Sequence, residues 1–104
     1  MQRYDEQSNG KIVTVSPGGQ VEICLSENPT TGFRWKVLQK GEPVCALLSD
    51  NFDAGARVPG QPGIHTWVFN VMAEGPATIE MIYRRAWDTS SSARTFTLHL
   101  SARK

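Results

Sequence analysis

Hydrophobic and polar residues alternate along most of this 104-residue chain. Because successive side chains point to opposite faces of a β-strand, alternation predicts strands that bury one face. No segment keeps the 3.6-residue period of an amphipathic helix. The predicted strands are 11–15, 20–25, 33–38, 44–48, 65–71, 77–83 and 94–100. The run 44–48 is also compatible with one helical turn, because its apolar residues do not alternate.

Turn-forming residues separate these strands. Glycine, proline and polar residues cluster at 16–19, 40–43 and 73–76. Seven short strands with regular turns and no helix favour an all-β fold, an immunoglobulin-like antiparallel β-sandwich of seven or eight strands. We expect residues 1–104 to form a single domain whose ordered core spans about residues 10–102.

The two faces of the third predicted strand differ clearly. Phe33, Trp35 and Val37 share one parity, and Arg34 and Lys36 share the other. The apolar set is predicted to face inward. Trp35 is therefore predicted to be a core residue, in the position of the buried tryptophan of immunoglobulin-like domains.

Three connections should meet at one end of the sandwich. If successive strands run in opposite directions, their connections alternate between the two ends. The first, third and fifth connections are short turns, whereas the other three are longer. These longer connections are 26–32, 49–63 and 84–92, of which 49–63 is rich in glycine and proline and is predicted to be a long loop. Three loops far apart in sequence are thus expected to lie side by side.

The first of these loops contains Asn28-Pro29-Thr30-Thr31-Gly32. Pro29 fixes its own φ and disfavours helical geometry at Asn28, while Gly32 permits a positive φ. Both threonines are β-branched and therefore restricted at χ1. A tip this stiff loses little entropy on docking, which suits a binding loop. The alternative is an ordinary turn between two strands, built from common turn residues.

The third loop contains Trp87, outside the strand alternation and between Ala86 and Asp88. Exposed tryptophan and arginine often anchor protein interfaces, which makes Trp87 a candidate contact residue. The alternative is that Trp87 folds back over the core, since tryptophan is highly buried on average. The neighbouring Arg84 and Arg85 are also compatible with a solvated pair.

Composition excludes several classes of function. The net charge is +1 and the longest basic cluster has two residues, which does not favour nucleic-acid binding. No apolar run is long enough to span a membrane. Residues 1–5 lack the apolar core of a signal peptide. The chain is thus either made without one or is a mature form restarted with Met, for which a periplasmic or secreted location stays open.

The two cysteines, Cys24 and Cys45, allow one disulfide at most, and two free thiols are favoured. There is no paired Cys-x-x-Cys, and His65 and His99 lie far apart, so neither a metal site nor a cofactor is expected. Cys24 with either histidine is formally a nucleophile and base pair. Cys24 lies in the middle of a predicted strand with no third orienting residue, so an enzyme is not favoured.

Three ordered motifs resemble those of the chagasin family, whose members inhibit papain-like cysteine peptidases. The first, 28–32 followed by Phe33 and Trp35, matches fully. The second is Gly60-Gln61-Pro62-Gly63, in which the family more often has another glycine at the position of Pro62. The third is Arg85-Ala86-Trp87, in which the family usually has proline at the position of Ala86. The similarity spans roughly residues 10 to 102 and includes the last predicted strand.

The resemblance implies a reversible, tight-binding protein inhibitor that inserts three loops into the active-site cleft of a papain or cathepsin L type peptidase. The first loop would cover the catalytic cysteine and histidine of the enzyme, and the others would flank it. The implied peptidase-binding residues are Asn28, Pro29, Thr30, Thr31, Gly32, Gly60, Gln61, Pro62, Gly63, Arg85, Ala86 and Trp87. A monomer that binds neither nucleic acid nor membrane is expected. The alternative is a generic immunoglobulin-like adhesion or carbohydrate-binding module, although no aromatic row lies on the predicted outward faces.

Overall fold

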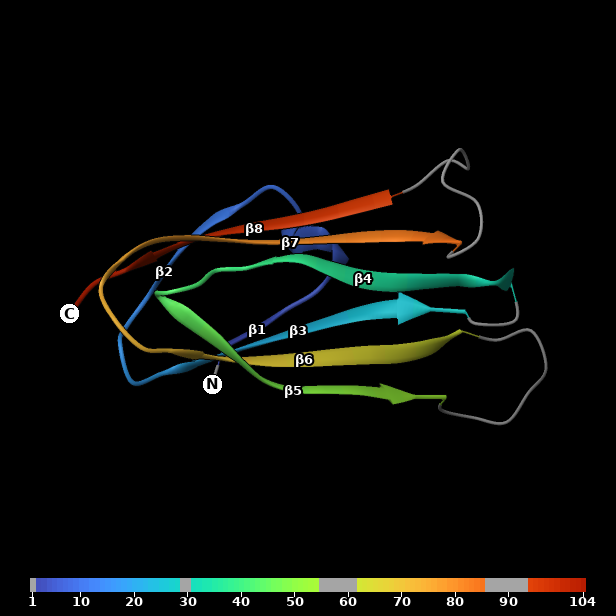
Figure 1. Ribbon diagram of the computed structural model, residues 1–104, viewed down its shortest axis with the longest axis horizontal. Coiled ribbons are helices and arrows are strands. Elements are labelled where there is room, and N and C mark those ends of the chain that lie inside the picture. Colours follow the sequence, from blue (N-terminus) through green and yellow to red (C-terminus); the bar gives the residue numbers. More distant parts are fainter. Residues whose placement is uncertain (1, 29–30, 55–61, 86–93) are drawn as a thin grey trace.

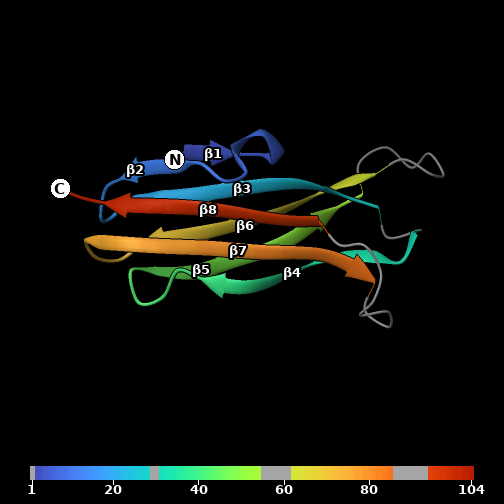
Figure 2. The same cartoon turned by 90° about the horizontal axis from the view of Figure 1, so that it is seen from above.

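The structure is a computed structural model that describes residues 2–28, 31–54, 62–85 and 94–104. Within these ranges the chain forms eight strands and one short 3-10 helix, arranged as two facing sheets (Figure 1 and Figure 2). The elements are β1 (Gln2–Tyr4), η1 (Glu6–Ser8), β2 (Ile12–Val15), β3 (Gln20–Glu27), β4 (Phe33–Lys40), β5 (Cys45–Asp53), β6 (Gly63–Val71), β7 (Gly75–Arg85) and β8 (Arg94–Ala102). The first sheet has the order β1-β3-β6-β5, and the second sheet has the order β2-β8-β7-β4.

This architecture confirms the predicted all-β, immunoglobulin-like sandwich. The pairings β3–β6, β5–β6, β4–β7 and β7–β8 are antiparallel, as expected. Two pairings at the sheet edges are parallel instead: β1 with β3, and β2 with β8. The parallel pairing of β1 with β3 arises because the chain crosses to the second sheet after β1, forms β2 there, and then returns to the first sheet as β3.

Two elements lie outside the predicted set. β1 is a three-residue strand without alternation, and η1 follows it. The N-cap residue of η1, Asp5, accepts a hydrogen bond from the Gln7 N–H at 2.9 Å, which satisfies one of the donors that a helix start leaves unpaired. Such short elements are specified by caps and neighbours rather than by a repeated hydrophobic pattern.

The predicted loop 49–63 is wrong in its first five residues and in its last, because β5 continues to Asp53 and β6 begins at Gly63. The register between β5 and β6 shifts between Leu47 and Ser49, and this bulge interrupts the alternation along β5. Beyond the bulge, β5 is a sheet edge whose residues 50–53 are exposed. A polar edge strand pairs through its backbone on one side only, so its sequence resembles that of a loop.

The core lies between the two sheets and consists of inward-facing residues from both. Its buried hydrophobic members are Val15, Val21, Ile23, Leu25, Val44, Cys45, Trp67, Phe69, Val71, Ile79, Met81, Phe96, Leu98, Leu100 and Ala102. The fully buried tryptophan is Trp67 on β6, which is 1% exposed. Trp35 faces inward and packs against this core, as predicted, but it is half-buried because β4 is an edge strand. The prediction that it takes the position of the buried tryptophan is therefore wrong.

The two cysteines are free thiols, as predicted. Cys45 is buried, and burial raises the pKa of its thiol. Cys24 is partly buried on the outer side of β3, and burial is again the largest cause of its raised pKa. Among the described residues, no helix has the length and hydropathy needed to cross a membrane. The same part of the chain contains no cluster of three or more histidine, cysteine or acidic side chains that could hold a metal ion.

We expect both thiols to be unreactive in the folded protein at pH 7. A raised pKa lowers the fraction of thiolate, the form that attacks a disulfide reagent. Ellman's reagent should therefore modify Cys24 slowly and Cys45 more slowly still, and both should react at once in denaturant. Rapid stoichiometric labelling of native Cys24 would contradict this and restore its candidacy as a nucleophile.

Candidate functional site

The strand ends that flank the three predicted loops lie at one end of the sandwich (Figure 1). At that end β3 leads to β4, β5 to β6, and β7 to β8. Backbone pairing ties these ends together: Glu27 lies opposite Gly63, and Phe33 lies opposite Arg85. The predicted clustering is thus confirmed for the strand ends that the structure describes. We call this region the loop end.

Half of the predicted site residues are described, and they stand at the bases of the loops. These are Asn28, Thr31, Gly32, Pro62, Gly63 and Arg85. The remaining predicted residues lie outside the described residues: Pro29, Thr30, Gly60, Gln61, Ala86 and Trp87. The described part of the site therefore consists of the contacts that anchor each loop to the sandwich.

Hydrogen bonds close the base of the first loop. The Thr31 hydroxyl and backbone N–H both donate to the Asn28 carbonyl, at 2.7 and 3.2 Å. The Asn28 N–H in turn donates to the Tyr83 hydroxyl on β7 at 3.0 Å. Gly32 has a φ of +82°, which confirms the left-handed geometry predicted for it. The Thr31 hydroxyl is thus used within the loop, where it helps to close the base.

Arg85 links the bases of the first and third loops. Its Nε donates to the Thr31 carbonyl at 3.2 Å. Its guanidinium also lies 4.9 Å from the centre of the Phe33 ring, within the range of a cation–π contact. These contacts hold the last residue of β7 against Thr31 and the first residue of β4, so the two loops leave the sandwich from a shared base.

Gly63 allows the backbones of β5 and β6 to approach closely at the base of the second loop. A Cβ at position 63 would lie 2.3 Å from the Asp53 carbonyl oxygen and 2.7 Å from Cζ of Phe52. Neither separation is possible for real atoms, so any other residue would push the two strands apart. The requirement for glycine here is steric and does not involve a positive φ.

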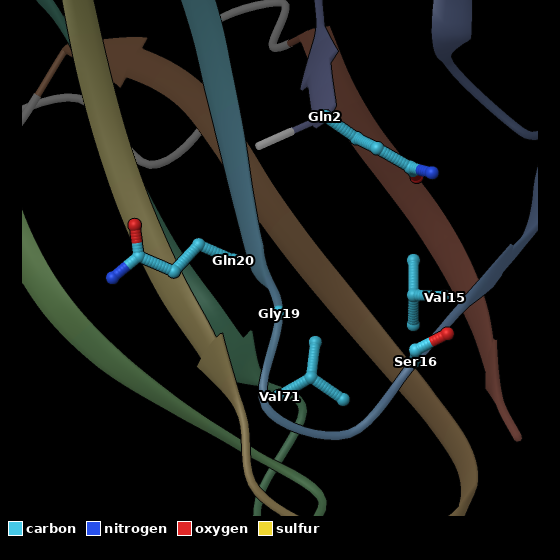
Figure 3. Close-up of a pocket in the computed structure, with 6 residues that line it drawn as sticks. All are labelled: Gln2, Val15, Ser16, Gly19, Gln20 and Val71. Carbon is cyan, nitrogen blue, oxygen red and sulfur yellow. The ribbon is translucent and has the colours of Figure 1, made fainter. Parts of the chain in front are cut away.

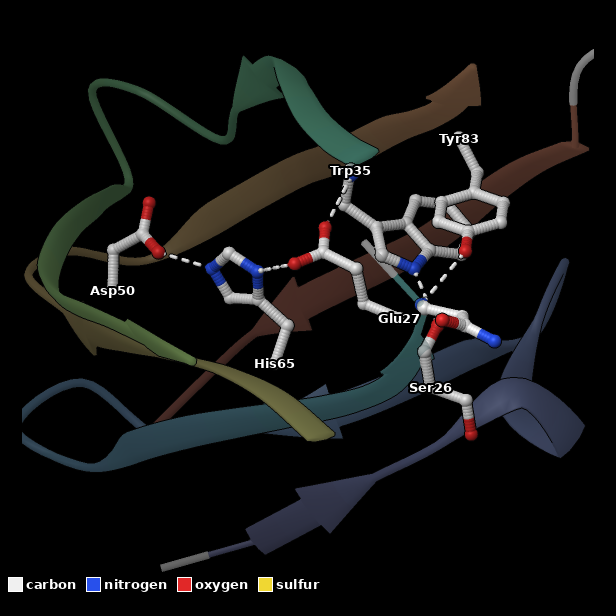
Figure 4. Close-up of polar contacts among 7 residues, drawn as sticks. Ser26, Glu27, Trp35, Asp50, His65 and Tyr83 are labelled. Carbon is white, nitrogen blue, oxygen red and sulfur yellow. Dashed lines mark hydrogen bonds and ion pairs between the residues drawn. The ribbon is translucent and has the colours of Figure 1, made fainter. Parts of the chain in front are cut away.

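A buried carboxylate, which the sequence analysis missed, lies beneath the first loop. Glu27 is 1% exposed and is the last residue of β3 (Figure 4). Its Oε2 accepts a hydrogen bond from the Trp35 N–H at 2.7 Å, and its Oε1 is 3.0 Å from Nδ1 of His65. The other ring nitrogen of His65 contacts Asp50 on β5. This chain of polar contacts joins β3, β6 and β5 of the first sheet to β4 of the second.

Aromatic rings surround this polar chain. The His65 ring stacks on Trp67, with centroids 4.0 Å apart and planes 4° from parallel. The Trp35 ring lies 4.8 Å from that of Tyr83, and its Nε1 donates to the Ser26 carbonyl at 2.9 Å (Figure 4). Every buried side-chain polar atom in the described part of the chain has a partner. The network therefore contains no unsatisfied polar group. Because an unpaired polar group is costly in the interior, a change in this geometry would destabilise the protein.

A sequence signal for Glu27 did exist. Val21, Ile23 and Leu25 alternate on the inward face of β3, and the same parity places Glu27 inward. A charged residue at an inward position requires a hydrogen-bonding partner, so it indicates a buried polar network. The predicted strand 20–25 stops two residues short of Glu27, which therefore falls in the predicted loop 26–32.

A cavity at the opposite end of the sandwich is separate from this site. It has a volume of about 210 Å³ and lies beside the turn between β2 and β3 (Figure 3). Its lining residues are Gln2, Val15, Ser16, Gly19, Gln20 and Val71. None of them belongs to the loop end, so the cavity contributes nothing to the predicted binding surface.

Comparisons with known proteins agree with the motifs. Residues 14–100 match the sequence model of the family described as Chagasin family peptidase inhibitor I42. Amoebiasin-1 from Entamoeba histolytica is 32% identical over 102 residues, which cover 92% of this chain and 94% of that protein.

Two solved structures share the fold. The crystal structure of the cysteine protease inhibitor EhICP2 from Entamoeba histolytica matches with a TM-score of 0.83 at 23% identity, over 98% of this chain and 94% of that chain. PbICP-C, solved in complex with falcipain-2, matches with a TM-score of 0.69 at 19% identity, over 98% of this chain and 90% of that chain. At these identities, the likeness shows the sandwich architecture alone.

We expect removal of the Glu27 carboxylate to be strongly destabilising. Glu27→Ala leaves the Trp35 N–H and Nδ1 of His65 without a partner, and should lower the free energy of unfolding by about 3 kcal/mol. Glu27→Gln keeps an oxygen for Trp35 and offers an amide N–H to His65, so it should cost about 1 kcal/mol. Urea denaturation at constant m-value measures both.

Glu22→Ala is the matched control on the same strand, since Glu22 pairs with the exposed Arg3 at the surface. Its cost should be below about 1 kcal/mol. Equal losses of unfolding free energy for Glu27→Ala and Glu22→Ala would show that the buried network contributes no more to stability than the surface ion pair. Equal losses for the two Glu27 variants would contradict the hydrogen-bond account.

Proposed function

This chain belongs to the chagasin family of peptidase inhibitors, and we propose that it closes the active-site cleft of papain-like cysteine peptidases with the three loops of its loop end. Its function is inhibition of cysteine peptidases and not catalysis, because the family consists of inhibitors. The observation that carries the proposed mode is the anchoring of the loop bases: Arg85 to Thr31 and Phe33, and Glu27 to Trp35 and His65.

Anchored bases support a rigid binding surface. An inhibitor that must order its loops on contact loses affinity, because immobilising each segment costs conformational entropy. Here the first loop is held by the Asn28, Thr31 and Tyr83 hydrogen bonds, and Gly63 packs the start of β6 against β5. Much of that entropy is therefore lost during folding rather than during binding.

The proposed inhibition is steric and reversible. The first loop would stand over the catalytic cysteine and histidine of the peptidase, with the second and third loops on either side of it. The proposed contacts are those named from the sequence, in 28–32, 60–63 and 85–87. Complexes of protease inhibitors typically bury about 800 Å² per partner, which three loops of this size can supply.

The proposed function predicts stoichiometric inhibition without cleavage. Titration of active-site-calibrated papain and of a cathepsin L type peptidase should give a linear loss of activity that ends at a 1:1 ratio. Mass spectrometry after prolonged incubation should find the chain intact. Absence of inhibition across both enzymes, or a cut within residues 28–32, would contradict the proposal.

The first loop should depend on the backbone geometry of Gly32. Alanine in the left-handed region costs about 1–2 kcal/mol, and a loop can relieve that strain by moving. Gly32→Ala should therefore weaken inhibition about tenfold or more, measured as the inhibition constant against one peptidase.

Gly18→Ala is the matched control for backbone strain. Gly18 has a φ of +89°, lies in the turn at the opposite end, and has open space for an added Cβ. We expect a similar loss of stability, of about 1–2 kcal/mol, with inhibition within about threefold of the parent. If the two variants weaken inhibition equally, the effect is a general loss of stability and the rigid-tip account is wrong.

A further inference from the structure

Three cations gather on the outer face of the second sheet, at the loop end. Arg34 on β4 lies directly opposite Arg84 on β7, and Lys36 follows on the same face opposite Ile82. The residues between them, Trp35 and Tyr83, turn inward, with their ring centroids 4.8 Å apart and their planes tilted by 31°. Arg34 and Lys36 are exposed and Arg84 is half-buried. We call Arg34, Lys36 and Arg84 the basic face.

The basic face does not serve the stability of the sheet. Like charges directly opposite each other on neighbouring strands repel. Within the described residues, no ion pair joins Arg34, Lys36 or Arg84 to a carboxylate. The acidic residue of the same face, Glu80, lies farther along β7, opposite Thr97 on β8 and Gln39 on β4, two residues from the partner of Lys36. The repulsion between Arg34 and Arg84 is thus offset by no direct ion pair within the described part of this sheet.

Among the described residues, charge is divided between the two sheets at this end. The described carboxylates near the loop end belong to the first sheet or pack on it: Glu6, Glu27, Asp50 and Asp53. The whole chain carries a net charge of only +1. The basic face is therefore a local feature, placed on one side of the loops, and not the result of a generally basic composition.

The basic face adjoins the proposed binding surface. Arg84 immediately precedes Arg85, and Arg34 immediately follows Phe33, the two residues that join the first and third loops. When those loops enter a cleft, the basic face stands beside the rim of the peptidase. Charges in such a position act over about 8–10 Å at physiological salt and raise association rates with a partner of opposite sign.

We propose that the basic face extends the peptidase-binding surface and selects peptidases whose cleft rim is acidic on the side of the second sheet. The proposal rests on the proposed function, because it names a property of the same partner. Its effect falls mainly on the rate of association, whereas the loops determine the rate of dissociation.

The experiment compares two triple variants that carry the same net charge. One removes the basic face: Arg34→Gln, Lys36→Gln and Arg84→Gln. The control removes three cations at the opposite end: Lys40→Gln, Arg103→Gln and Lys104→Gln. Association and dissociation rates are measured from progress curves at several salt concentrations. The partners are two papain-like peptidases, one with an acidic cleft rim and one with a basic rim.

With the acidic peptidase at low salt, the basic-face variant should associate about tenfold more slowly than the parent, and the control within about twofold. The difference should shrink as salt rises, and dissociation should change by less than about threefold. With the basic peptidase, the basic-face variant should associate as fast as the parent or faster. Unfolding transitions of both variants confirm that they are folded.

Equal association rates for the two triple variants with the acidic peptidase would overturn the proposal. So would a loss that is the same at all salt concentrations, since that would show a contact rather than a field. Binding of the parent and the basic-face variant to heparin is measured as well. If the variant loses heparin binding while its association with the acidic peptidase is unchanged, the face would be assigned to a polyanion instead. Failure of the proposed function is distinguishable, because the parent would then inhibit neither peptidase.

Discussion

The buried carboxylate of Glu27 is the constraint on which the geometry of the loop end depends. A carboxylate in a protein interior is tolerated only when both oxygens have good partners. The partners here are a backbone N–H from the other sheet, at Trp35, and the ring of His65 on the neighbouring strand. Both partners can reach the carboxylate in only a few relative positions of the two sheets. Folding therefore determines where β3 ends and β4 begins.

Such a network adds little net stability, but it fixes the relative positions of the strands that it joins. A well-packed apolar pair of the same volume would often stabilise a sandwich equally well, because burying charge is costly. What an apolar pair lacks is direction, since hydrophobic contacts tolerate small shifts and hydrogen bonds at 2.7–3.0 Å do not. A molecule that must present a loop in one orientation gains from that difference.

The sequence predicted the strands that alternate, including the edge strands β2 and β4, but missed β1 and the second half of β5, for one physical reason. A strand such as β3 or β8 buries one face, so every second residue is apolar and the alternation is visible. β1 is too short to show a pattern, and β5 has a bulge followed by an exposed stretch. The same reasoning explains the site. Local stiffness identified Gly32, whereas Glu27 draws on residues up to 38 positions away, and pairing at that distance is not encoded locally.

The register of β4 against β7 connects the anchored loops to the basic face. Pairing of Phe33 with Arg85 brings the cation over the ring, and the next pair along, Arg34 with Arg84, necessarily points to the opposite face. A slip of one residue would reverse both faces at once: it would bury the arginines and expose the aromatic residues. Glu27 opposes that slip, because it holds the N–H of Trp35, two residues farther along β4. One buried side chain on the first sheet thus fixes both the loop base and the charged surface of the second.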